Sequence, residues 1–88
     1  MDSSKQENNK DLYIGIGECF RLALGKDFQE VDLIKLEFKV AREWDSLSHI
    51  KLMANLRDKF SIKLSFEDMV KMTSYSEVLR IVSSHLQR

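Results

Sequence analysis

The chain has 88 residues, which is enough for one small domain with a single modest hydrophobic core. Hydrophobic residues make up 43% of the sequence and charged residues 32%, a balance that fits a folded soluble domain and excludes global disorder. Fourteen basic and fourteen acidic residues cancel, so no overall field favours nucleic acid or an anionic membrane as a partner.

The beginning of the chain shows no apolar stretch typical of an export signal. Residues 1–10 are polar and rich in Ser, Lys, Gln and Asn, which predicts a disordered segment ahead of one folded domain over residues 11–88. No apolar run approaches the roughly 20 residues that a membrane span requires. The single cysteine, Cys19, precludes an intrachain disulfide and is expected in the core. We therefore expect a cytoplasmic protein that does not insert into a membrane.

The first expected helix runs from about Leu12 to Leu24, with Asp11 as its N-cap. Its apolar residues recur at spacings of three and four and form one stripe, which comprises Leu12, Ile16, Cys19, Phe20 and Ala23. Gly25 follows the last apolar residue and is placed to end the helix in the left-handed conformation.

A long connection, residues 26–45, follows this helix. Its apolar residues are scattered, and neither a period of two nor one of 3.6 persists. Alternation over residues 34–40 would suit a strand, but a single strand has no partner here. We therefore expect an ordered loop packed on helices, and a loop this long in so small a domain is usually functional.

A second helix is expected over residues 46–60, with Asp45 or Ser46 as its cap. Its apolar residues form two adjacent rows at helical spacing: Leu47, Ile50 and Ala54 in one, and Leu52, Leu56 and Phe60 in the other. The second row is expected to face the core. Leu47 and Ile50 fit either core packing or contact with a partner.

Two more helices complete the expected fold. Ser65 caps a short third helix that ends near Val70. Ser74 precedes Glu77 by three residues, a capping-box pattern that opens a last helix extending to about Leu86. The sequence thus predicts an all-α fold: a four-helix bundle with a long first loop and a short third helix.

Ser46 is the main candidate for chemistry, because it follows an acid and opens an apolar helix. A nucleophilic serine needs a base and an oxyanion hole, yet no G-x-S-x-G elbow surrounds Ser46. His49 lies three residues on and is expected on the solvated surface of the helix. One cysteine, two separated histidines and dispersed acids give no metal-ligand spacing. We expect no catalytic residue and no metal site.

Attachment chemistry suits Ser46 better than catalysis. A phosphodiester made at a helix start would meet free backbone N–H groups and the positive end of the helix dipole. The neighbouring Asp45 either helps to orient a metal-bound donor in a modifying enzyme or simply caps the helix. By itself, the Asp45-Ser46-Leu47 string is typical of an ordinary N-cap.

Several short motifs, in their order and spacing, resemble those of the acyl carrier protein family. The match covers roughly residues 11–86 and is strongest over residues 44–81. Four stretches carry it: Asp45-Ser46-Leu47 followed by Ile50, Leu52, Ala54, Leu56 and Phe60; Phe60-Ser61-Ile62-Lys63-Leu64; Ser65-Phe66-Glu67-Asp68; and Met72-Thr73-Ser74-Tyr75-Ser76-Glu77-Val78.

This resemblance implies a modification and a role. Ser46 would carry a 4′-phosphopantetheine arm, which a separate phosphopantetheinyl transferase attaches from coenzyme A. The thiol of the arm would hold an acyl group as a thioester and present it to acyl-loading and acyl-processing enzymes. The chain, expected to be a monomer, would itself catalyse nothing. Ser48 is a rival attachment site, but the preceding Asp45 and the following Leu47 favour Ser46.

The charge of the second helix departs from this family's pattern. Family members are typically acidic there, whereas residues 46–60 carry three cations, Lys51, Arg57 and Lys59, against the single acid Asp58. Opposite charges steer correct partners and like charges suppress wrong ones. We therefore expect a dedicated carrier in a specialised, non-housekeeping pathway such as a fatty acid or polyketide biosynthesis.

Trp44 also departs from the family pattern, in which a small or aliphatic residue is common. Its ring either packs over the first helix or lies beside the arm, where it would shield the thioester or anchor a partner. The residues expected to contact partners are Trp44, Leu47, Ile50, Lys51 and Ala54. The alternative function left open is an unmodified helical adaptor that uses the Leu47, Ile50 and Ala54 face for protein contacts.

Overall fold

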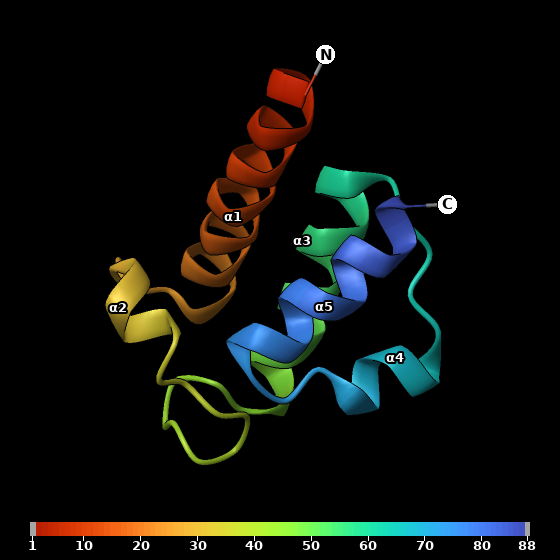
Figure 1. The fold of residues 1–88 in the computed structure, drawn as a ribbon. Coiled ribbons are helices and arrows are strands. Elements are labelled where there is room, and N and C mark those ends of the chain that lie inside the picture. Colours follow the sequence, from red (N-terminus) through yellow and green to blue (C-terminus); the bar gives the residue numbers. More distant parts are fainter. Residues whose placement is uncertain (1, 88) are drawn as a thin grey trace.

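The computed structural model describes the backbone of residues 2–87 and the side chains of residues 11–87. These residues form five helices, drawn in Figure 1: α1 (Asp2–Leu24), α2 (Glu30–Leu33), α3 (Ser46–Phe60), α4 (Phe66–Lys71) and α5 (Tyr75–Leu86). Between residues 2 and 87 there is no strand, only an isolated antiparallel bridge between Glu37 and Ser74. The predicted all-α class is confirmed, with a long first connection and a short helix before the last one.

Helix α1 begins earlier than the apolar pattern indicated. It starts at Asp2, so Asp11 lies inside the helix and is not its cap. Residues 2–10 contain neither glycine nor proline, the residues that most disfavour a helix. The expected disordered segment over residues 1–10 stays a prediction, because Met1 and the side chains of residues 2–10 lie outside the described part. Gly25 ends the helix as expected, with a φ of 72°.

The core lies between α1, α3 and α5. Helix α1 packs mainly against α3 and also against α5 (Figure 1). The fully buried Phe20 ring meets the Trp44 ring edge-on at a centroid distance of 5.0 Å and the Tyr75 ring at 5.5 Å. Gly15 allows α1 and α3 to approach closely, since a Cβ there would lie 2.9 Å from the Phe60 ring. A larger residue at this position would therefore require the Phe60 and Lys59 side chains to shift.

The long connection between α1 and α3 is ordered and contains one short helix that the sequence pattern did not indicate. This helix, α2, buries Leu33, and the Gln29 N–H donates to an Asp32 carboxylate oxygen at its start. The rest is a loop held by backbone bonds: Phe38 N–H donates to the Thr73 carbonyl, 2.9 Å from nitrogen to oxygen. The expectation of an ordered loop packed on helices is correct, and the alternative strand does not form.

The caps of the last two helices follow the sequence pattern with one exception. Ser65 Oγ accepts from the Asp68 N–H at 3.0 Å, and Asp68 returns a bond to the Ser65 N–H. Ser74 Oγ likewise accepts from the Glu77 N–H at 3.3 Å. The Glu77 carboxylate, however, pairs with Arg80 at 2.6 Å and does not close the predicted capping box. A charged partner one turn along α5 competes successfully with a neutral backbone donor.

Candidate functional site

Ser46 is the first residue of α3, and its side chain is exposed. The cap of this helix is the preceding residue: Asp45 has extended backbone geometry, and its Oδ1 accepts from the Ser48 N–H at 2.9 Å. This hydrogen bond lowers the pKa of the Asp45 carboxyl. The sequence left Asp45 and Ser46 open as the cap, and the structure assigns that role to Asp45. The Ser46 hydroxyl is therefore not needed to hold the helix start.

Trp44 lies directly before this cap and is fully buried. Its ring packs edge-on against Phe20 of α1 and lies 6.0 Å from the Phe38 ring, centroid to centroid. Packing over the first helix, one of the two expectations for Trp44, is thus correct. The expectation that Trp44 contacts a partner is not supported, because no part of its side chain reaches the surface. Its burial fixes the backbone that leads into Asp45 and Ser46.

His49 holds Trp44 in place. The indole N–H of Trp44 donates to His49 Nδ1 at 3.0 Å, and the other ring nitrogen, Nε2, lies 2.9 Å from the Met69 carbonyl oxygen in α4. Because an indole N–H can only donate, Nδ1 must accept, which places the proton on Nε2 and directs it to Met69. His49 was expected on the solvated surface. It instead joins the loop, α3 and α4, a connection that one sequence cannot reveal.

The same bonds bear on what Ser46 can do. Both nitrogens of His49 are occupied, so this histidine does not offer a base to the Ser46 hydroxyl. The second histidine, His85, pairs with Asp68 at 2.8 Å on a different part of the bundle. Among the described side chains, no group of three or more His, Cys, Asp or Glu residues could hold a metal ion. Neither histidine is therefore placed to act as a base on the Ser46 hydroxyl.

The structure separates the two apolar rows of α3. Leu52 and Leu56 are fully buried, as expected for the inward row. Leu47 and Ile50 are 63% and 65% exposed, so the alternative of core packing does not apply to them. Of the other residues expected to contact partners, Lys51 is exposed and Ala54 half-buried. These four side chains are at least partly accessible on the helix that Ser46 opens, and their contact with partners stays a prediction.

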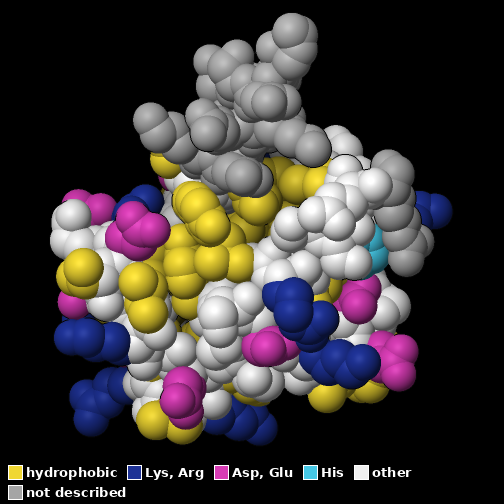
Figure 2. All heavy atoms as spheres, in the orientation of Figure 1, with side chains coloured by type: hydrophobic (Ala, Val, Ile, Leu, Met, Phe, Trp, Pro, Cys, Tyr) yellow, Lys and Arg dark blue, Asp and Glu magenta, His cyan; other side chains and the backbone are white. Residues whose placement is uncertain are grey.

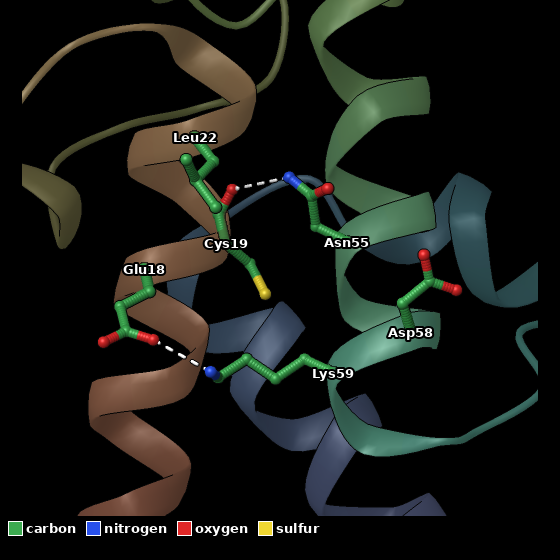
Figure 3. A pocket seen from close by; sticks show the side chains of 6 residues that line it. All are labelled: Glu18, Cys19, Leu22, Asn55, Asp58 and Lys59. Atoms are coloured by element: carbon green, nitrogen blue, oxygen red, sulfur yellow. Dashed lines mark hydrogen bonds and ion pairs between the residues drawn. The ribbon is translucent and has the colours of Figure 1, made fainter.

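A hollow of about 370 Å³ lies between α1 and α3 but away from Ser46. Figure 3 shows the contacts that cross it: the Lys59 ammonium pairs with the Glu18 carboxylate at 2.9 Å, and the Asn55 amide donates to the Cys19 carbonyl at 3.2 Å. The Cys19 side chain is buried, as predicted, and burial raises the pKa of its thiol to about 11. The two contacts join the helices, and the raised pKa keeps the Cys19 thiol protonated at neutral pH.

A second exposed apolar area lies on another face. Figure 2 shows hydrophobic side chains gathered near α1 and α2. Tyr13 and Ile14 of α1 are exposed, and together with Tyr75 they help to line a hollow of about 200 Å³ between α1, α2 and α5. None of its lining residues belongs to α3, so this area is separate from the Ser46 face.

Comparison with known proteins agrees with the motif resemblance. The chain is 29% identical, over 77 residues, to an acyl carrier protein from Exiguobacterium sp. (strain ATCC BAA-1283 / AT1b). The alignment covers 88% of this chain and 96% of that relative. No family model and no solved structure matches the chain. In the part of the chain that the structure describes, no helix has the length and apolar character to cross a bilayer.

Proposed function

We propose that this protein is an acyl carrier, not an enzyme, and that its Ser46 hydroxyl receives a 4′-phosphopantetheine arm from coenzyme A. One observation carries the proposal: Ser46 opens α3 with an exposed side chain while Asp45 supplies the cap. The similarity to an acyl carrier protein over most of both chains supports the same conclusion.

Attachment requires a separate phosphopantetheinyl transferase. Ser46 Oγ forms the new bond to the phosphorus that bears the pantetheine portion of coenzyme A, and the bond to the second phosphate breaks. Adenosine 3′,5′-bisphosphate leaves, and the serine proton passes to a base or water of the transferase. When bound, the arm supplies a terminal thiol on which an acyl group is held as a thioester.

The residues around Ser46 fit a phosphodiester. Helix α3 has 15 residues, so the positive end of a substantial helix dipole lies at Ser46 and favours a phosphate there. The first turn of α3 contains no acidic residue. The nearest carboxylate in sequence, that of Asp45, is directed to the Ser48 N–H. A phosphate on Ser46 would share this helix end with the Asp45 carboxylate, which is already bonded to the Ser48 N–H.

We further propose that the carrier serves a dedicated biosynthetic pathway in the cytoplasm. Leu47 and Ile50 provide an accessible apolar surface beside the arm for acyl-loading and acyl-processing enzymes. Lys51 and Arg57 give this surface a positive character. A partner whose docking surface is basic, as suits an acidic carrier helix, would meet like charges here. This repulsion disfavours its complex with the present chain.

Loading with an acylated donor tests the proposal. The chain is incubated with acetyl-coenzyme A and a promiscuous phosphopantetheinyl transferase, and its intact mass is measured before and after treatment with neutral hydroxylamine. We expect a gain equal to acetyl-phosphopantetheine, from which hydroxylamine removes only the acetyl group as its hydroxamate. No gain with any of several transferases would contradict the proposal and favour the unmodified adaptor.

A further inference from the structure

We infer that the exposed face of α3 beside Ser46 docks partner enzymes that present acidic side chains around an apolar depression. The inference rests on the proposed function, because it specifies the chemistry of the partners that must reach Ser46. The centre of this face is apolar and its margins are cationic. The exposure of the side chains defines the centre, and the lack of ion-pair partners defines the margins.

The apolar centre consists of Leu47 and Ile50, which lie on successive positions of the same outward side of α3 and are each more than half exposed. In the loop that leads to α3, Val40 is also 76% exposed. The backbone of this loop closes on the helix start, since the Lys39 N–H donates to the Trp44 carbonyl at 2.9 Å. Large apolar side chains exposed around one functional group mark a contact surface.

The cationic margin lies along α3. Lys51 lies four residues after Leu47, and Arg57 lies seven residues after Ile50, so each cation is on the same side of α3 as that apolar residue. Both side chains are exposed, and neither forms an ion pair with any other side chain in residues 11–87. Lys59 differs, because its ammonium is bound to Glu18 of α1 at 2.9 Å. The free positive charges of α3 are thus the two on the outward face.

The loop end of the surface is also cationic. Lys39 and Arg42 are exposed and have no carboxylate partner among the described side chains. Of the acids in this region, Glu43 pairs with Lys26 at 3.1 Å and Asp45 caps α3. The exposed Asp58, next to Arg57, has no cationic partner among the described side chains, so it offsets one of the four cations. Cations therefore flank the apolar centre at both ends, although the chain as a whole is neutral.

This arrangement selects for partner charge. Exposed, unpaired charges contribute little to folding but act over several ångströms on an approaching protein and change its association rate by roughly 10-fold or more at low salt. An acidic rim would be attracted and a basic rim repelled. Because only a few cations lie on an otherwise neutral chain, a protein surface fits better than the dense charge of a nucleic acid.

The test uses one promiscuous phosphopantetheinyl transferase in two forms, with a basic and with a charge-reversed acidic carrier-docking surface. The rate constant kcat/KM for loading Ser46 from coenzyme A is measured for each form at low salt and at about 1 M salt. At about 1 M, charges separated by more than roughly 3 Å are largely screened from each other. The carrier is compared with K51E/R57E and with K35E/K63E. The control carries the same change in charge at exposed positions, one near α2 and one beyond the far end of α3.

We expect the wild-type carrier to be loaded faster by the acidic form at low salt, with the preference lost at high salt. K51E/R57E should shift the preference toward the basic form by about 10-fold, and K35E/K63E by less than about 2-fold. If K51E/R57E fails to fold by circular dichroism, the neutral pair K51Q/R57Q should abolish the preference. Equal shifts for both charge-reversal pairs, or a wild-type preference for the basic form, would overturn the inference about docking. The proposed function would still stand in that case, because Ser46 is loaded. If neither form loads the wild type, the docking inference and the proposed function are both contradicted.

Discussion

The indole N–H of Trp44 donates to His49 Nδ1 at 3.0 Å, and His49 in turn bonds to α4 through the Met69 carbonyl. Trp44 is fully buried, so its N–H has no access to water and depends on this acceptor. The Phe38 ring covers His49 from the loop at a centroid distance of 4.4 Å. The position of the exposed Ser46 is therefore set by contacts of the buried Trp44 and the half-buried His49 and Phe38.

Replacing His49 should reveal this dependence. His49→Ala leaves the buried indole N–H of Trp44 unpaired, which costs about 1–3 kcal/mol in the free energy of unfolding. Chemical denaturation of His49→Ala, Trp44→Phe and the double variant gives a double-mutant cycle for the pair. We expect a coupling energy of at least about 0.5 kcal/mol. A coupling near zero would show that the hydrogen bond does not hold Trp44.

Mutation of the cap, Asp45, and of the candidate attachment residue, Ser46, should affect stability differently. Asp45→Ala removes the acceptor of the Ser48 N–H and should lower the thermal midpoint, whereas Asp45→Asn keeps an acceptor and should restore most of it. Ser46→Ala should change the free energy of unfolding by less than about 0.5 kcal/mol, because its exposed hydroxyl caps nothing. Unfolding of Ser46→Ala under native conditions would assign Ser46 a structural role.

Two leucines of α3 provide a matched test of its orientation. Leu56 is fully buried and Leu47 is 63% exposed on the same helix. Leu56→Ala should cost about 2–5 kcal/mol in the free energy of unfolding, which would unfold much of so small a domain. Leu47→Ala should cost less than about 0.5 kcal/mol. Similar losses of unfolding free energy for the two variants in urea denaturation would mean that the assignment of Leu56 to the buried side of α3 is wrong.

Acid should weaken the contact between α4 and α5. The hydrogen bond from His85 lowers the pKa of the Asp68 carboxyl below its ordinary value. A carboxyl whose pKa is lower in the folded chain stabilises the fold above its unfolded pKa, about 4, and loses that contribution as the pH falls through the folded value. Protonation of Asp68 therefore destabilises the protein in acid.

His85→Ala removes the largest cause of this lowered pKa. The unfolding free energy of the wild type, measured in urea from neutral pH downward, should fall more steeply below about pH 5 than that of His85→Ala. Ser84→Ala, which alters the neighbouring side chain and leaves the His85–Asp68 pair intact, should follow the wild type. Parallel curves for wild type and His85→Ala would exclude this pair as a source of the acid sensitivity.

Much of this fold could be predicted from the sequence because helix caps and helix ends depend on residues close together in the chain. The caps at Ser65 and Ser74 and the stop at Gly25 depend on residues within three or four positions, and each occurs as expected. The bounds of α3 follow from a cap and an apolar period in the same way. Helix α1 was placed too short because an apolar stripe marks where a helix packs, and not where it begins.

The remaining features depend on contacts between distant segments. The bond from His49 to Met69 spans 20 positions, and no spacing rule connects a helix histidine to the carbonyl of another helix. Trp44 fits both a surface anchor and a core residue until the Phe20 ring is known to lie against it. Leu47 and Ile50 belong to an apolar row adjacent to the buried one, so periodicity alone left their exposure undecided.

The intact mass of three variants tests the central claim most directly. Wild type, Ser46→Ala and the control Ser48→Ala are each incubated with coenzyme A and a promiscuous phosphopantetheinyl transferase, after circular dichroism has shown that all three are folded. The account predicts a gain of one phosphopantetheine for wild type and Ser48→Ala and none for Ser46→Ala. A gain that persists in Ser46→Ala, or that is lost in Ser48→Ala alone, would contradict it.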